Sequence, residues 1–173
     1  INIGDTVGCA LPEEMKALIT YLNLQVPGIE GVSTSVHCHN DLGLATANSL
    51  AALDASIDQI ECTVNGIGER AGNAALEEVV IAIKTRQNYW GCDTAIRLDS
   101  LLPLSRWVET HGGLVVQANK AVVGKNAFSH ESGVHVDGMV KCEKTYEYID
   151  RHLLGVNEFS LVLGRQSGRK SFK

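Results

Sequence analysis

The sequence predicts an α/β protein in which parallel strands alternate with helices. Three strand–helix pairs follow one another in the first half of the 173-residue chain, and the residues with chemically useful side chains stand where each predicted strand ends. After Gly91 the pattern changes to helices and irregular segments. Repeated βα units require parallel strands joined by right-handed crossovers, so we expect either part of a (β/α)8 barrel or a small open sheet.

The first strand–helix pair occupies the N-terminal residues. Ile1 to Gly4 is a short apolar strand, and Pro12 fits the first turn of the following helix, where its missing N–H costs nothing. Pro27-Gly28 ends that helix. Its apolar residues recur at helical spacing and are Met15, Leu18, Ile19 and Leu22.

The second and third pairs repeat this order. The strand from Val32 to Val36 leads into two histidines, and an Ala- and Leu-rich helix follows from Leu44 to Ala55. The strand from Gln59 to Val64 leads into a glycine-rich stretch. A third amphipathic helix then carries its apolar residues at Leu76, Val79, Val80 and Ile83.

The second half of the chain is predicted to form a small, mainly helical subdomain. Leu98 to Thr110 has the pattern of one helix, and Tyr146 to His152 that of another, shorter helix. Between them, Ser129 to Gly138 is dense in polar and potentially catalytic side chains. We therefore expect two domains, residues 1–91 and residues 92–173.

Composition and charge exclude several classes of protein. The formal charge of −5 argues against a general nucleic-acid binder, and no apolar run is long enough to span a membrane. The five cysteines contain no C-x-x-C pair, which favours reduced thiols and a cytoplasmic location. The abrupt start on a strand at Ile1 suggests a fragment of a longer protein.

His37-Cys38-His39 is the clearest candidate for a metal site. Alternate side chains of a strand share a face, so the two imidazoles are expected to point the same way. Imidazole is the commonest metal ligand in proteins, although a histidine pair can equally be structural. Cys38 should face away from both rings and pack against a helix.

A glycine-rich stretch follows the third predicted strand. Its glycines, from Gly66 to Gly72, are spaced G-x-G-x-x-x-G, which departs from the dinucleotide fingerprint, and the chain has no P-loop motif. Asn73 stands before an apolar-periodic helix, where it could be the N-cap or a third metal ligand. Glu69 and Arg70 could equally form a surface ion pair.

Four segments together resemble the family of 2-isopropylmalate, homocitrate and citramalate synthases. They are Asp5-Thr6-Val7-Gly8, HCHNDLGLA at 37–45, NGIGERAGN at 65–73 and HESGVHVDG at 130–138. The wider superfamily of metal-dependent barrel enzymes also contains hydroxymethylglutaryl-CoA lyase. The resemblance implies a (β/α)8 barrel, to which this chain contributes strands six to eight and the start of the subdomain that follows.

The resemblance also implies a divalent cation, Mg, Mn or Zn. Family members hold it with an Asp from the first barrel strand, the two His of His-x-His and an Asn that closes the glycine loop. Carried over, the ligands in this chain are His37, His39 and Asn73. The first-strand Arg-Asp pair and a catalytic glutamate on an earlier strand are absent, and neither Asp5 nor Asp41 is placed to substitute.

Three further residues match positions with functional roles in the family. Thr6 matches the threonine that receives the carboxylate of a 2-oxo acid, and Glu69 lies in the loop that lines the acyl-CoA side. His135 matches the histidine that reaches into the neighbouring subunit's site and assists proton transfer. Residue type alone favours a histidine packed against a turn between Gly133 and Gly138, because assignment of a general base needs geometry first.

The implied activity is a metal-dependent Claisen condensation of acetyl-CoA with a 2-oxo acid in a homodimer. The run from Asn119 to Ser132 most resembles 2-isopropylmalate synthase, which uses 3-methyl-2-oxobutanoate in leucine biosynthesis. His135 to Gly138 is more like bacterial homocitrate synthase, so homocitrate and citramalate synthase remain alternatives. A different class of function is a catalytically incomplete metal-binding or interaction fragment. Because part of the machinery is missing, the chain alone is expected to be inactive.

Overall fold

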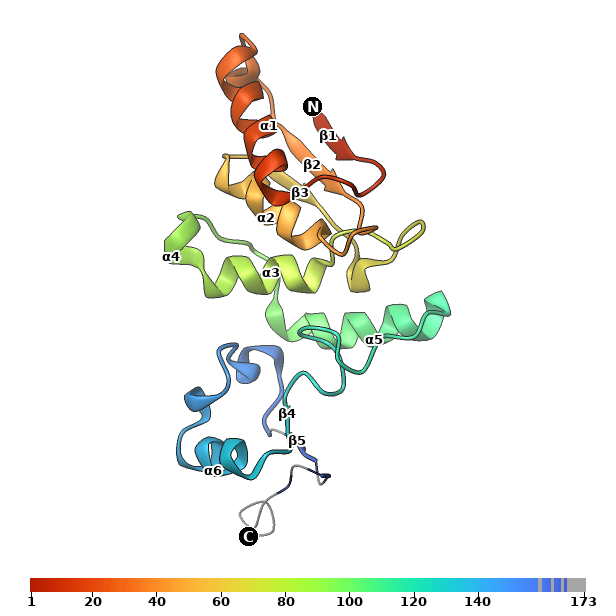
Figure 1. The fold of residues 1–173 in the computed structure, drawn as a ribbon, viewed down its shortest axis with the longest axis vertical. Coiled ribbons are helices and arrows are strands. Elements are labelled where there is room, and N and C mark those ends of the chain that lie inside the picture. The colour runs from red at the N-terminus through yellow and green to blue at the C-terminus, as the bar shows by residue number, and fades with distance from the viewer. Residues whose placement is uncertain (159, 163, 166, 168–173) are drawn as a thin grey trace. The chain divides into compact units, whose positions relative to one another are not determined.

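The computed structural model describes residues 1–158, 160–162, 164, 165 and 167. The chain forms two compact units, Ile1–Ala95 and Ile96–Lys173 (Figure 1). The domain boundary predicted from the sequence followed Gly91. Among the described residues, no helix combines the length and apolar character that a membrane crossing needs.

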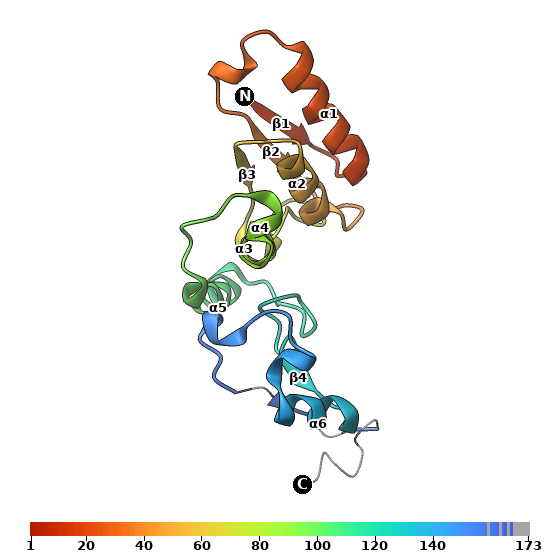
Figure 2. The ribbon, with the colours of Figure 1, turned by 90° about the vertical axis from the view of Figure 1, so that its left-hand side faces the viewer.

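The first unit consists of three strand–helix pairs in the predicted order (Figure 2). The strands form one parallel sheet in the order β1-β2-β3, in which Asn2 pairs with Ser35 and His37 pairs with Glu61. The elements are β1 (Asn2–Asp5), α1 (Pro12–Gln25), η1 (Ile29–Gly31), β2 (Ser35–Cys38), α2 (Ala45–Asp54), β3 (Gln59–Glu61), η2 (Val64–Gly66), α3 (Leu76–Thr85) and α4 (Gln87–Trp90).

One face of this sheet packs against helices. Val36 and Cys38 of β2 are fully buried in a cluster with Met15 and Ile19 of α1 and Ala52 of α2. Full burial of a Val, Ile or Met side chain stabilises a fold by about 1.5–3 kcal/mol. Because side chains alternate along a strand, the polar residues occupy the opposite face. That face carries Asn2, Ser35, His37 and Glu61.

The second unit is mainly helical. Its first helix confirms the prediction for residues 98–110, as a short 3-10 turn followed by a longer α-helix. Ser129 and His130 pair in parallel with Ser160 and Leu161. The elements are η3 (Leu98–Ser100), α5 (Leu101–Gly112), β4 (Ser129–His130), α6 (Gly133–Lys141), η4 (Glu143–Thr145), η5 (Arg151–Leu154) and β5 (Ser160–Leu161).

The short helix predicted from Tyr146 to His152 is wrong. Residues 146–150 are not helical, and a 3-10 turn begins only at Arg151. The carboxylate of Asp150 accepts a hydrogen bond from the His152 backbone N–H at 3.0 Å, so Asp150 caps the start of that turn. The buried guanidinium of Arg151 is in turn held by Glu143 and Glu147, each at 2.7 Å.

The turn expected between Gly133 and Gly138 is also wrong, because these residues belong to α6. Gly138 sits in the helix beneath the ring of Tyr146. A Cβ at this position would lie 2.5 Å from Cε2 of that ring, which is closer than real Cβ contacts allow. The glycine therefore permits a close contact between helix and ring, and it does not break the helix.

Candidate metal centre

His37 lies in β2 and His39 is the first residue beyond it. The two side chains lie together, as the alternation of side chains along a strand predicts. The ring centroids of His37 and His39 are 5.0 Å apart, with an interplanar angle of 61°. Cys38 faces the helices, and burial raises the pKa of its thiol to about 11. Its side chain therefore belongs to the core, on the side of the strand away from the two imidazoles.

Asn73 is brought to the same place by the loop that follows β3. The Asn40 N–H donates to the Gly72 carbonyl at 2.9 Å, and the Ala74 N–H donates to the Cys38 carbonyl at 3.1 Å. Between these two bonds, His39 and Asn73 form an isolated antiparallel bridge. The N-cap of α3 is Ala75, so the interpretation of Asn73 as a helix cap is wrong.

The glycines of this loop make room for the Asn73 side chain. A Cβ at Gly68 would lie 2.4 Å from Asn73 Nδ2, and one at Gly72, where φ is +89°, would lie 2.0 Å from the Gly66 carbonyl oxygen. Asn73 Nδ2 donates to the Ile67 carbonyl at 3.0 Å. The close approach of the loop thus fixes the amide, and it explains the glycine spacing without any phosphate ligand.

Two buried polar atoms at this point lack a hydrogen-bond partner among the described residues. They are Nδ1 of His39 and Oδ1 of Asn73. An unpaired buried acceptor costs about 1–3 kcal/mol, so such atoms are rarely left without a ligand. Together with the neighbouring imidazole of His37, these residues offer nitrogen and amide oxygen donors, which are types that a divalent cation such as Zn, Mn or Mg accepts.

The nearby carboxylates are already engaged. Asp5 is buried and accepts hydrogen bonds from the Cys9 N–H at 3.0 Å, the Ala10 N–H at 3.2 Å and Asn48 Nδ2 at 3.4 Å. It therefore holds the loop after β1. Among the described residues, no group of three or more His, Cys, Asp or Glu side chains is arranged to hold a metal. The carboxylate ligand that the resemblance implies has no counterpart there.

Arg70 links the loops that follow all three strands. Its Nε donates to Asp41 Oδ1 at 2.8 Å, and its Nη2 donates to Asp41 Oδ2 at 3.0 Å and to the Thr6 carbonyl at 2.7 Å. The hydrogen bond from Arg70 lowers the pKa of Asp41. Glu69 is 84% exposed and its carboxylate lies 3.7 Å from Arg70. The predicted ion pair between Glu69 and Arg70 is present. The contacts of Arg70 with Asp41 and Thr6 are shorter than this ion pair, and they are the ones that join the loops.

A second contact missed by the sequence analysis connects β3 to the histidines. Nδ1 of His37 and Oε2 of Glu61 are 3.1 Å apart. The sequence contains one signal for this contact, because polar residues occupy every second position of strands that are expected to line a barrel. Its meaning depends on register, because only the pairing of β2 with β3 places Glu61 beside His37.

His135 belongs to the second unit. It lies on α6, is exposed, and its ring centroid is 4.2 Å from that of Tyr146 and 6.3 Å from that of His130. Its ring therefore packs on an aromatic side chain at the surface of the unit.

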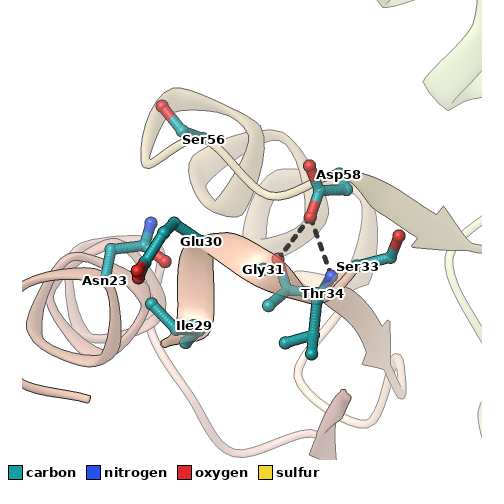
Figure 3. Close-up of a pocket in the computed structure, with 9 residues that line it drawn as sticks. Asn23, Ile29, Glu30, Gly31, Ser33, Thr34, Ser56 and Asp58 are labelled. Carbon is teal, nitrogen blue, oxygen red and sulfur yellow. Dashed lines mark hydrogen bonds between the residues drawn. The ribbon is translucent and has the colours of Figure 1, made fainter. Parts of the chain in front are cut away.

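A separate pocket of about 390 Å³ opens at the other end of the strands (Figure 3). Asp58 and Thr34 both line this pocket. The Asp58 carboxylate accepts hydrogen bonds from the backbone N–H and the hydroxyl of Thr34, at 2.8 and 3.0 Å. These bonds lower the pKa of Asp58. The pocket lies at the amino ends of β2 and β3, which in βα folds serve stability, whereas ligands bind at the carboxyl ends.

Two family models match successive parts of this chain. The family model described as HMGL-like matches residues 1–108, and the model described as homocitrate synthase post-HMGL domain-like matches residues 122–173. The chain is 54% identical over 173 residues to a 2-isopropylmalate synthase of Pyrococcus furiosus, of which it covers 35%. It is 54% identical over 169 residues to one of Rhodopirellula baltica, of which it covers 32%. The chain thus spans about a third of the length of these relatives.

Solved structures of HMG-CoA lyases also resemble this chain. The HMG-CoA lyase of Bacillus subtilis is 26% identical, with a TM-score of 0.56 over 68% of this chain and 39% of that protein. The HMG-CoA lyase of Acinetobacter baumannii, solved with coenzyme A and 3-methylmalate, is 29% identical, with a TM-score of 0.56 over 71% of this chain and 41% of that protein. The prediction of a partial (β/α)8 barrel and the resemblance noted in the sequence are confirmed. By its fold and by the match over residues 1–108, the chain belongs to the HMGL-like family.

Proposed function

We propose that this chain is part of an enzyme that joins acetyl-CoA to a 2-oxo acid in a metal-dependent Claisen condensation. The observation that carries the proposal is the convergence of His37, His39 and Asn73 at the carboxyl ends of neighbouring strands, with buried donor atoms left unpaired. The names of the relatives favour 3-methyl-2-oxobutanoate as acceptor, hence 2-isopropylmalate synthase and leucine biosynthesis. Homocitrate and citramalate synthase are the alternatives within the family.

The reaction defines what the site must supply. The methyl carbon of acetyl-CoA loses a proton and attacks the carbonyl carbon of the 2-oxo acid, whose oxygen gains the electron pair and then a proton. Hydrolysis of the thioester releases CoA. A bound divalent cation supplies Lewis-acid stabilisation of the negative charge that develops on that oxygen. His37, His39 and Asn73 are neutral donors, so they leave the positive charge available for this purpose.

The remaining roles are proposed from the resemblance to the synthase family. Arg70 fixes the backbone of Thr6 at the mouth of the site, and we assign the exposed Thr6 hydroxyl to the carboxylate of the 2-oxo acid. Exposed Glu69, on the glycine loop, faces the acyl-CoA side in this proposal. We assign His135 of the second unit to proton transfer in the site of a second subunit, which requires a homodimer. A cytoplasmic location belongs to the same proposal.

Residues 1–173 alone are proposed to bind a cation weakly and to lack turnover. Asp5 is committed to the loop after β1, and Asp41 is committed to Arg70. Neither can complete the metal site without breaking those bonds. We therefore propose that activity needs a further carboxylate from outside residues 1–173.

The test is release of CoA thiol by the full-length protein that contains these residues. Acetyl-CoA is supplied with 3-methyl-2-oxobutanoate, 2-oxoglutarate or pyruvate, before and after removal of divalent metal with a chelator. We expect turnover that disappears with the metal and returns when Mg, Mn or Zn is added, with the highest kcat/KM for 3-methyl-2-oxobutanoate. Absence of turnover with all three acceptors contradicts the proposal, whereas a preference for another acceptor changes only the substrate.

A further inference from the structure

We infer that Glu61 is a positioning residue that orients the imidazole of His37 for cation binding. The inference rests on the metal site proposed above. Glu61 Oε2 lies 3.1 Å from Nδ1 of His37, which is hydrogen-bonding distance. The two residues are register partners on neighbouring strands, so the sheet itself holds them side by side on one face.

Glu61 is itself held by residues from the other two strands. Its Oε1 accepts hydrogen bonds from Asn2 Nδ2 at 2.5 Å and from Ser35 Oγ at 3.2 Å. Asn2 Nδ2 also donates to Ser35 Oγ at 2.8 Å. One carboxylate oxygen is thus anchored across the sheet, and the other is directed at His37.

This arrangement determines which nitrogen of His37 is available. When the carboxylate accepts the Nδ1–H, Nε2 is the nitrogen that carries the lone pair and can bind a cation. Carboxylate partners of metal-bound histidines fix the ring and increase its basicity, and their loss typically weakens metal binding about 10–100-fold. Glu61 would therefore act through His37, without touching the cation or the substrate.

The alternative is an ordinary surface ion pair. Glu61 and His37 side chains are 38% and 31% exposed in this chain, and pairs of that exposure contribute little to stability. The environment argues for the specific role. The inner faces of (β/α)8 barrels are filled mainly by Val, Ile and Leu, yet here Asn2, Ser35 and Glu61 form a connected polar row that ends on His37.

The test compares Glu61→Ala and Glu61→Gln in the full-length protein. We expect Glu61→Ala to raise the dissociation constant for Mn²⁺ about 10–100-fold by calorimetry, and Glu61→Gln, which keeps an acceptor oxygen, to raise it less. In the metal-free protein, nitrogen NMR of His37 should show the Nδ1–H tautomer, and Glu61→Ala should abolish that preference. Unchanged Mn²⁺ affinity together with an unchanged tautomer overturns the inference.

Two controls separate this inference from its premises. Asp58→Asn removes another carboxylate, which accepts hydrogen bonds from Thr34 at the far end of the strands, and it should leave Mn²⁺ affinity unchanged. His37→Ala tests the metal site itself. If His37→Ala leaves affinity unchanged, the proposed metal site fails; if His37→Ala weakens binding and Glu61→Ala does not, only the role of Glu61 fails.

Discussion

Arg70 and Asp41 show how two charged surface residues can fix the backbone of Thr6, the residue proposed to bind the 2-oxo acid. The guanidinium makes a two-pronged contact with the carboxylate and gives one further hydrogen bond to the Thr6 carbonyl. The close approach of these loops also requires Gly8, where a Cβ would lie 2.7 Å from the Asp41 backbone nitrogen. A planar guanidinium suits this geometry, and a lysine could not reproduce it.

The Asp41–Arg70 pair predicts a pH dependence with a definite sign. The hydrogen bond from Arg70 lowers the pKa of Asp41 in the folded chain, so the stability it contributes is present above the ordinary Asp value of about 3.9 and is lost as the pH falls through the lowered value. Carboxyl carbon NMR should show Asp41 titrating below that value, and Arg70→Gln should move the midpoint upward. An unchanged midpoint in Arg70→Gln would show that the pair does not form in solution.

At the residue scale, alternation along one strand was enough to predict that His37 and His39 converge and that Cys38 faces the core. The contacts of Arg70 and Glu61 were not predictable in this way. Their partners come from other strands and loops, and a sequence without an assigned register does not say which residues become neighbours. The same limit left Asn73 with two interpretations until the loop geometry excluded the helix cap.

At the scale of elements, the glycine loop between β3 and α3 brings Asn73 to the candidate site. It folds back so that Asn73 bridges to the residue that follows β2. Gly72 is needed twice, for its positive φ and for its approach to the Gly66 carbonyl. The loop therefore carries Asn73, which follows β3, to the end of β2, where we propose that its side chain binds the cation.

Substitution of Gly72 by Ala should weaken cation binding, and Gly28→Ala provides a matched control. Both glycines have positive φ, +89° and +83°, so each alanine costs about 1 kcal/mol of backbone strain. Only at Gly72 does the new Cβ collide with the chain, since nothing lies within 4 Å of a Cβ at Gly28. We expect a weaker Mn²⁺ affinity by calorimetry for Gly72→Ala alone. Equal affinities in the two variants would contradict the role assigned to the loop.

The elements of the first unit follow from the sequence with small shifts of their ends. The second predicted strand, Val32 to Val36, instead runs from Ser35 to Cys38, because pairing with β1 and β3 begins only there. The second unit was harder to predict. Helix α6 contains Gly133 and Gly138, which normally indicate a break, and only the contact with Tyr146 explains the second of them.

At the scale of the whole molecule, the candidate residues divide between the two units. Thr6, His37, His39, Glu69 and Asn73 belong to the first, and His135 belongs to the second. The resemblance assigns His135 to the site of a second subunit. That assignment requires an assembly of at least two chains for activity.

Mixed oligomers test this assignment. A full-length His135→Ala protein and a full-length His37→Ala protein should each be inactive, because one lacks the proton-transfer group and the other a cation ligand. Unfolding the two together and refolding the mixture should restore thiol release, since a mixed dimer contains one intact site. No recovery in a mixture shown by mass spectrometry to contain mixed dimers would contradict action across subunits.

We propose that one divalent cation binds His37, His39 and Asn73 together. Pulsed electron paramagnetic resonance of Mn²⁺ bound to full-length protein with ¹⁵N-labelled histidine tests it most directly, because it detects imidazole nitrogens bound to the metal. We predict couplings from two histidines, with one lost in His37→Ala and one lost in His39→Ala. A spectrum without histidine coupling, or one that neither substitution changes, would contradict the claim.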